Sequence, residues 1–166
     1  NIDPFNILAL TFTNKAAKEM RDRIEAVAGT EARNLWMGTF HSVFARILRS
    51  EADKLGYPSN FTIYDADDSK SLVKTIVKEL NLDDKVYKPN VVFNRISGAK
   101  NRLISWREYI NNPIYQADDE SNMKPELGKI YQIYAQRCFK AGAMDFDDLL
   151  FQTNVLFREH TDVLNK

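Results

Sequence analysis

The sequence predicts a mainly α-helical fold with a small α/β portion, in which two parallel-type strands near the N-terminus are followed by a helical subdomain. Two observations carry this prediction. Residues 6–13 and 35–39 are short runs rich in strand-forming residues, and each leads directly into a helical pattern, as in an α/β layer. From Asp65 onward, apolar residues recur almost only at three- and four-residue spacing, which is typical of packed helices.

The first 56 residues predict the order strand, helix, strand, helix. After the first strand, Thr13 or Asn14 is positioned to cap a helix that ends at Gly29. The second strand leads into a helix whose apolar side chains share one face: Phe40, Val43, Phe44, Ile47, Leu48 and Leu55.

The middle of the chain predicts one extended segment and then helices. Residues 61–64 form the extended segment, and Asp65 or Asp67 caps the helix after it. Pro89 begins another helix, and Ser105 begins a short one with a capping-box pattern.

The last third predicts a loop between helices. Residues 111–122 are polar and rich in turn-forming residues, so we expect a loop there. A long helix is expected over about 124–141, with Cys138 on its apolar stripe and therefore buried. Asp145 caps the final helix.

Two strands are too few for a stable α/β domain, so the chain is expected to be part of a larger sheet with a helical insertion. We place the α/β portion at residues 1–56, the insertion at 57–142 and a return helix at 143–166. Strands with unpaired edges tend to find partners, and we therefore expect a homodimer through them.

Composition limits the classes of function. The 166 residues hold 23 Lys or Arg and 23 Asp or Glu, so a strongly basic nucleic-acid binder is excluded and any DNA contact must be local. Residues 91–110 form one local basic segment, with four Lys or Arg and one acidic residue. The single cysteine excludes an internal disulfide, and no stretch approaches the roughly 18 apolar residues of a membrane span. We expect a cytoplasmic protein that does not contact a membrane.

Both strand-to-helix junctions offer groups that suit a nucleic acid. Thr11, Phe12, Thr13 and Asn14 follow the first strand, where ligands of parallel sheets bind and where the first amides of a helix attract phosphate. An aromatic ring there offers a face on which a base can stack. The second junction, residues 38–42 (GTFHS), repeats the arrangement. Capping and core packing alone would explain either junction, but two on one sheet edge strengthen the binding hypothesis.

These residues resemble a known family. The runs TFTNKAAKEM and GTFHS, followed by ISGAKN at 96–101 and MDFDDLL at 144–150, are similar to the superfamily 1A DNA helicases of the UvrD/PcrA/Rep type. The resemblance covers essentially the whole chain, in the family's order.

The resemblance implies specific contacts. It implies that single-stranded DNA is contacted by Thr11, Phe12, Thr13 and Asn14 at the first junction, and by Thr39, His41 and Ser42 at the second. It implies that residues 57–142 are the inserted subdomain 1B, near the duplex junction. Arg95, Lys100 and Arg102 lie in the basic segment and are candidate duplex or phosphate contacts, although solvated surface is the simpler explanation.

The chain departs from the family at the nucleotide site. The loop G-x-x-x-x-G-K-[ST], whose amides cradle the phosphates of ATP, does not occur in the sequence. The resemblance implies that this loop precedes residue 1, and that the Mg²⁺-holding acidic motif and the arginine finger follow residue 166. We therefore expect a fragment of an ATP-dependent 3′→5′ helicase, with no cofactor and no catalytic residue of its own; ATP and Mg²⁺ belong to the whole protein.

Three alternatives remain open. The chain could come from the helicase subunit of a recombination helicase–nuclease, although an insertion of about 85 residues favours the compact type. It could be a non-enzymatic helical interaction domain with no affinity for nucleic acid. It could be a Mg²⁺-dependent nuclease centred on Asp145, Asp147 and Asp148, although these residues also fit a helix cap.

Overall fold

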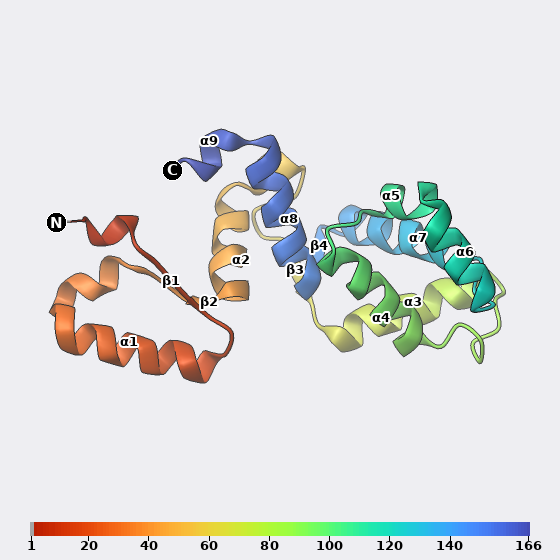
Figure 1. The fold of residues 1–166 in the computed structure, drawn as a ribbon, viewed down its shortest axis with the longest axis horizontal. Helices are drawn as coiled ribbons and strands as arrows, with labels where there is room; N and C mark the ends of the chain where they lie inside the picture. Colours follow the sequence, from red (N-terminus) through yellow and green to blue (C-terminus); the bar gives the residue numbers. More distant parts are fainter. Residues whose placement is uncertain (1) are drawn as a thin grey trace.

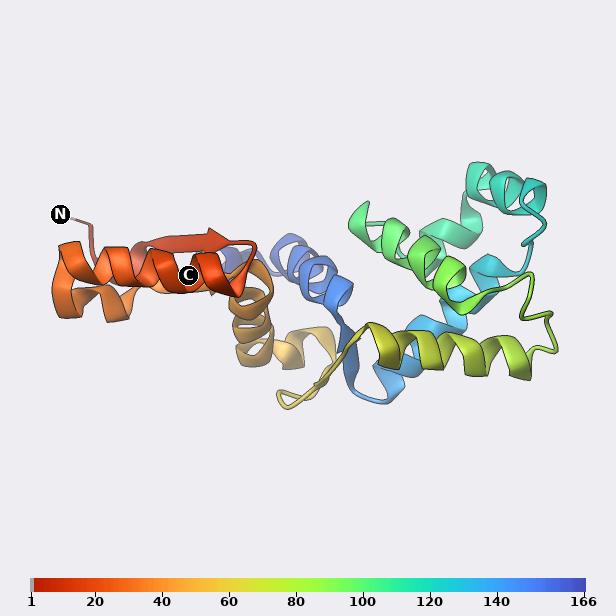
Figure 2. The same cartoon turned by 90° about the horizontal axis from the view of Figure 1, so that it is seen from below.

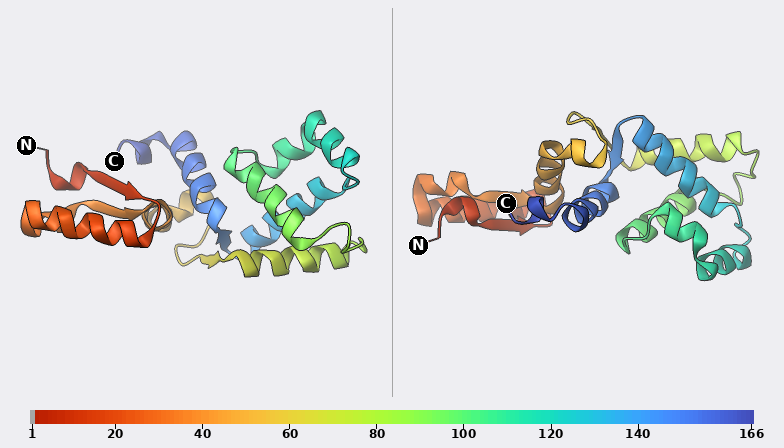
Figure 3. Two further views of the ribbon diagram at one scale, coloured as in Figure 1. Left: turned by 60° about the horizontal axis from the view of Figure 1, so that its bottom comes forward. Right: turned by 90° about the horizontal axis from the view of Figure 1, so that it is seen from above.

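A computed structural model describes residues 2–166 as an elongated molecule. The strands β1 and β2 and helix α1 form one end, helices α3 to α7 form the other, and α2 and α8 lie between them (Figure 1). Figures 2 and 3 show the same separation from other directions. The strands are β1 (Leu8–Thr11), β2 (Trp36–Thr39), β3 (Thr62–Tyr64) and β4 (Ala143–Asp145). The helices are α1 (Asn14–Ala28), α2 (Phe40–Ser50), α3 (Ala66–Glu79), α4 (Pro89–Asn101), α5 (Trp106–Asn111), α6 (Pro113–Ser121), α7 (Leu127–Lys140), α8 (Phe146–Glu159) and α9 (Thr161–Leu164), with 3-10 turns η1 (Pro4–Asn6), η2 (Gly29–Asn34) and η3 (Ala52–Leu55).

The α/β end follows local sequence signals closely. Strands β1 and β2 pair in parallel, with Leu8 opposite Trp36 and Thr11 opposite Thr39. Helix α1 packs against the pair and ends before Gly29, whose φ of 62° suits a residue without a side chain. The predicted strand–helix–strand–helix order is therefore confirmed, and the fold is mainly α with a small α/β portion.

One hydrophobic core lies inside helices α3 to α7. Most of its members lie on the apolar faces of α3, α4 and α7, and Tyr87 and Tyr109, which the sequence pattern did not indicate, are buried with them. Tyr109, Tyr131 and Tyr134 are the largest of its fully buried side chains, and Cys138 is buried in the same core, as predicted. The pKa of the Cys138 thiol is raised to about 12, chiefly by burial, so it stays protonated at neutral pH.

A second core connects the two ends of the chain. Helix α8 packs against α2, and Leu48, Phe61, Met144 and Leu156 are buried between these elements. Strand β3 pairs in parallel with β4, so that Tyr64 lies opposite Asp145. The segment that leaves the α/β end and the segment that returns to it are thus joined by hydrogen bonds as well as by packing.

The expectation of a loop over residues 111–122 was wrong. Helix α6 occupies Pro113–Ser121, separated from α5 by Asn112 alone. The Asn112 side chain accepts a hydrogen bond from the amide of Ile114 at 3.0 Å, and Pro113 fits the first position of a helix. Asn112 and Pro113, which suggested a turn, instead form the start of a helix.

Strand β4 was also not predicted, because three residues are too few to show a periodic pattern. All three of its residues are buried, and they are held by pairing with β3, which is distant in sequence. None of the helices within residues 2–166 has the length and apolar character needed to cross a membrane.

Candidate nucleic-acid interface

The two predicted junctions come together at one edge of the β1–β2 pair. Because the strands are parallel and in register, Thr11 and Thr39 are neighbours, and helices α1 and α2 both begin at this edge (Figure 1). The Thr13 hydroxyl accepts a hydrogen bond from the amide of Ala16, and the Thr39 hydroxyl accepts one from the amide of Ser42, each at 3.2 Å. The edge therefore presents two capped helix N-termini, which attract anions.

Three aromatic side chains are in contact at this edge. Phe12 is 87% exposed and lies 5.0 Å from Phe40, centroid to centroid, in a tilted arrangement. Phe40 in turn meets Phe44 at 5.9 Å, edge to face. The exposure of Phe12 excludes a role as a core residue. Its ring contacts Phe40 and is otherwise open to solvent, which is what the stacking of a nucleotide base requires.

A second aromatic contact joins α2 to α8. The His41 ring lies 5.8 Å from the Phe146 ring in an edge-to-face arrangement, and Phe146 is 47% exposed. We call these two pairs, Phe12 with Phe40 and His41 with Phe146, the aromatic row, because Phe40 and His41 are adjacent at the start of α2. The sequence motifs contain Phe40 and Phe146, but local spacing does not reveal that they join the row, because Phe146 is over a hundred residues from His41 and is brought there by packing of α8 on α2.

Several predicted hydroxyls already have partners within the chain. The Thr11 hydroxyl donates to the carbonyl of Thr13 at 3.0 Å. The Thr39 hydroxyl donates to the Ser42 hydroxyl at 3.0 Å, and the Ser42 hydroxyl donates to the carbonyl of Thr39 at 2.9 Å. These side chains form the turns at the strand ends. Phe12, Asn14 and His41 are the predicted residues whose side chains are most open to a ligand.

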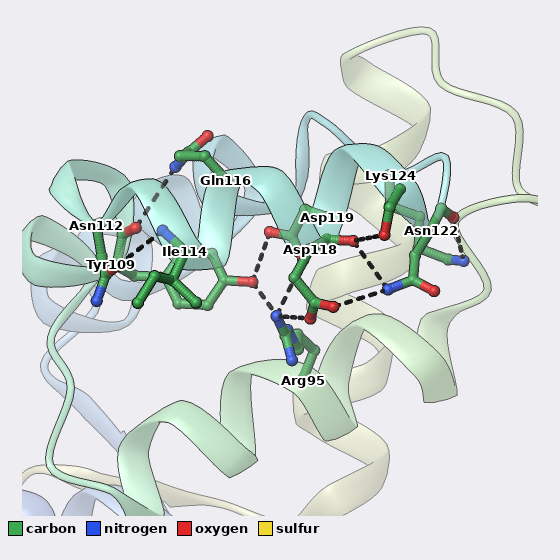
Figure 4. A network of polar contacts seen from close by, with 10 residues as sticks. Arg95, Tyr109, Asn112, Ile114, Gln116, Asp118, Asp119, Asn122 and Lys124 are labelled. Carbon is green, nitrogen blue, oxygen red and sulfur yellow. Dashed lines mark hydrogen bonds and ion pairs between the residues drawn. The ribbon is translucent and has the colours of Figure 1, made fainter.

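Arg95 is held by the helical subdomain. Its guanidinium donates to the Tyr109 hydroxyl at 3.0 Å and to Asp118 at 2.6 Å, and lies 3.3 Å from Asp119 (Figure 4). The Tyr109 hydroxyl donates to Asp119 at 2.6 Å. Burial raises the pKa of the Asp119 carboxyl, although Tyr109 and Arg95 oppose this. Arg95 thus connects α4 to α6 through ion pairs with Asp118 and Asp119.

Lys100 is buried, which contradicts its placement as a surface contact. Its side chain is 4% exposed, and its ammonium lies 2.8 Å from Asp145 and 2.9 Å from Asp148. Burial lowers the pKa of Lys100, but the two carboxylates outweigh it and raise the pKa well above the usual value. The Lys100 ammonium therefore faces the interior, where duplex DNA has no access. Arg102 is exposed and ends α4.

The acidic group at the start of α8 is a helix cap. Asp145 accepts a hydrogen bond from the amide of Asp148 at 2.8 Å, and Asp148 accepts one from the amide of Asp145 at 3.1 Å. Tyr134 also donates to Asp145 at 2.7 Å. Among residues 2–166, no set of three or more His, Cys, Asp or Glu side chains is grouped for a metal ion. The nuclease hypothesis therefore has no ligand set in these residues.

Comparison with known proteins identifies the family. The model of the UvrD/REP helicase N-terminal domain matches residues 1–166. The ATP-dependent DNA helicase PcrA of Staphylococcus epidermidis is 40% identical over 166 residues, which is 99% of this chain and 22% of that protein. PcrA of Staphylococcus aureus is 38% identical over 165 residues, with the same coverage. The chain thus spans 22% of the length of these curated relatives, and it belongs to the UvrD/REP helicase N-terminal domain family.

Proposed function

We propose that this chain is the part of an ATP-dependent DNA helicase that holds single-stranded DNA, with the strand lying across the aromatic row. The observation that carries the proposal is Phe12, which projects into solvent at the carboxyl edge of a parallel strand pair and is supported by Phe40. Membership of a helicase family supplies the context, and the relatives at about 40% identity are named as ATP-dependent DNA helicases.

The aromatic row contributes stacking, and the helix N-termini contribute electrostatics. Stacking of a base on an aromatic side chain contributes about 1–3 kcal/mol and tolerates any sequence, which suits an enzyme that moves along DNA. Thr11, Thr13, Thr39 and Ser42 shape the turns that present the amides, and Asn14 and His41 add side chains able to contact the strand.

Hydrolysis of ATP is assigned to other parts of the whole protein. Residues 1–166 contain no G-x-x-x-x-G-K-[ST] loop, so the residues present do not fit a site for the phosphates of ATP. We therefore propose that this chain alone does not hydrolyse ATP, and that ATP and Mg²⁺ act elsewhere in a 3′→5′ helicase.

The helical insertion has a separate role in this proposal. We assign residues 1–56 and 143–166 to the motor portion and residues 57–142 to the insertion. Helices α2 and α8 share one core, to which Tyr57 and Phe61 also contribute, and helices α3 to α7 surround a separate core. We place the insertion near the duplex junction, with Arg102 as the remaining exposed candidate contact among the three predicted. Arg95 and Lys100 serve the insertion's internal structure and its attachment.

Fluorescence anisotropy of a labelled oligo-dT, measured at low salt and then over a salt series, tests the proposal. The chain is expected to bind, and Phe12→Ala combined with His41→Ala is expected to weaken binding at least about fivefold, since one lost stack is worth about 1–3 kcal/mol. Phe5→Ala is the matched control, because Phe5 is also exposed but lies near the other end of β1. Absence of binding by the unmodified chain, or equal loss in the control, would contradict the proposal and favour a protein-interaction domain.

A further inference from the structure

A cleft of about 390 Å³ lies on the helical subdomain, between the loop that precedes α4, the first turn of α4 and the turn that joins α6 to α7. We call it the lysine cleft. It is remote from the motor portion, because Lys100, which meets α8, lies eleven residues after Pro89, or about 17 Å along a helix. Its charged and apolar lining consists of Lys85, Val86, Lys88, Val91, Met123 and Lys124.

The lining of the lysine cleft is cationic and contains no acidic side chain. Lys85 and Lys88 are exposed, and neither they nor Lys124 form an ion pair in the described part of the chain. The Lys124 ammonium donates to the carbonyl of Asn122 at 3.3 Å, which leaves its charge unbalanced. In the same loop as Lys85, Asp83 accepts a hydrogen bond from the amide of Lys85 at 2.9 Å and does not line the cleft. The cleft therefore favours a negatively charged partner.

The lining also contains three exposed apolar side chains: Val86, Val91 and Met123, the last of which is 78% exposed. Apolar groups that are exposed together and bordered by charge are typical of surfaces that bind proteins. The phosphates of a DNA duplex would pair with the lysines but leave these apolar side chains in water. A peptide that carries both carboxylates and apolar side chains would cover both kinds of group.

The backbone around the lysine cleft is fixed before any partner binds. Tyr87 is buried in the core of the helical subdomain, and its amide donates to the carbonyl of Asp83 at 2.8 Å. The Tyr87 hydroxyl accepts a hydrogen bond from the amide of Glu126 at 3.1 Å, which ties the loop before α4 to the start of α7. The amide of Lys124 donates to the carbonyl of Asp119 at 2.7 Å and holds the opposite wall. A preformed surface loses less conformational entropy on binding.

We propose that the lysine cleft binds an acidic segment of a partner protein. Carboxylates of that segment pair with Lys85, Lys88 and Lys124, and one of its apolar side chains covers Met123. The inference does not depend on the proposed function, because the cleft and the aromatic row share no residue and lie on different parts of the chain.

Fluorescence anisotropy of a labelled peptide in which Glu alternates with Leu tests the proposal. The chain is expected to bind the peptide, and Lys88→Gln combined with Met123→Asn is expected to weaken binding at least about fivefold. Asparagine is chosen because it tolerates the φ of 59° at Met123. The matched control is Lys74→Gln combined with Ile114→Asn, which removes the same charge and a side chain of similar exposure, 76%, from outside the cleft. Absence of peptide binding by the unmodified chain, or equal weakening in the control, overturns the inference.

Altered peptides show which groups the cleft recognises. A peptide with Lys in place of Glu is expected not to bind, because its charges repel those of the cleft. A peptide with Ser in place of Leu is expected to bind at least about fivefold more weakly, because the apolar contact is lost. Equal affinity for all three peptides would overturn the inference.

Two further measurements separate the acidic peptide from other occupants. A blunt DNA duplex is expected not to displace the peptide, and the Lys88→Gln, Met123→Asn variant is expected to keep its affinity for oligo-dT. Displacement by the duplex, with weaker duplex binding in this variant, would assign the cleft to DNA and overturn the inference. Self-association of the unmodified chain that this variant abolishes would assign the cleft to a second copy and would also overturn it.

Discussion

Replacement of Lys100 by Met is expected to destabilise the chain more than any surface substitution. Methionine has a similar length but no charge, so the change leaves Asp145 and Asp148 buried without the ammonium that lies within 2.9 Å of both. Removing one partner of a buried ion pair costs about 3–5 kcal/mol, because the remaining charge is neither hydrated nor paired. That loss is a large part of the total stability of about 5–15 kcal/mol expected for a domain.

The cost should depend on pH, because Asp148 can take up a proton. Burial raises its pKa to about 6, and the loss of Lys100 raises it further. The free energy of unfolding of Lys100→Met, measured by urea denaturation followed by circular dichroism, is expected to fall by about 3–5 kcal/mol at pH 8 and by less at pH 5. Combining it with Asp148→Asn should recover part of the loss at pH 8, since one buried charge is then removed.

The matched control is Lys129→Met, at an exposed lysine on α7 that forms no ion pair within residues 2–166. Such a substitution is expected to change the free energy of unfolding by no more than about 0.5 kcal/mol. A loss below about 1 kcal/mol for Lys100→Met at pH 8, or no recovery on adding Asp148→Asn, would refute the account of Lys100 as a buried counterion.

Two further predictions follow from the same structure. In the unmodified chain the pKa of Asp148 is higher in the folded state than in the unfolded state, so the folded state binds a proton there more tightly. This contribution to the free energy of unfolding is complete below about pH 4 and is lost as pH rises to about 6. Asp148→Asn should therefore make the free energy of unfolding, measured with urea, less dependent on pH over that interval. The exposed edge of β1 is expected to pair with a second copy, so sedimentation should show a dimer that Leu8→Lys converts to a monomer, and a monomer of the unmodified chain at high concentration would contradict this.

Local signals were sufficient to predict the α/β end. A strand run, a capping Thr and a helical stripe are all readable within about fifteen residues, and the structure confirms them at β1–α1 and β2–α2. The same approach was wrong at residues 111–122, because an Asn followed by a Pro is typical both of a turn and of the start of a helix. In the folded chain, α6 is also held by the buried hydrogen bond from Tyr109 to Asp119, which joins residues ten positions apart and shows in no local pattern.

In the candidate site too, local sequence places some residues, and others are placed by packing between segments that are distant in sequence. The positions of Phe12 and His41 follow from their junctions, so sequence reasoning could place both on one sheet edge, but it left open whether Phe12 is exposed or part of the core. Lys100 was misplaced because a lysine in a basic segment is usually solvated, and only the return of Asp145 and Asp148 from 45 or more residues away buries it. The contact of Phe146 with His41 was missed for a related reason, because the two residues lie on different helices, α8 and α2, that are distant in sequence.

These two surprises have one structural cause, the start of α8. Phe146 lies between Asp145 and Asp148, and these two residues both form the capping box and hold the ammonium of Lys100. The residues that flank Phe146 are therefore held both by the cap within α8 and by Lys100 on α4. Helix α4 thus helps to set the position of one end of the aromatic row without itself contributing a residue to the row.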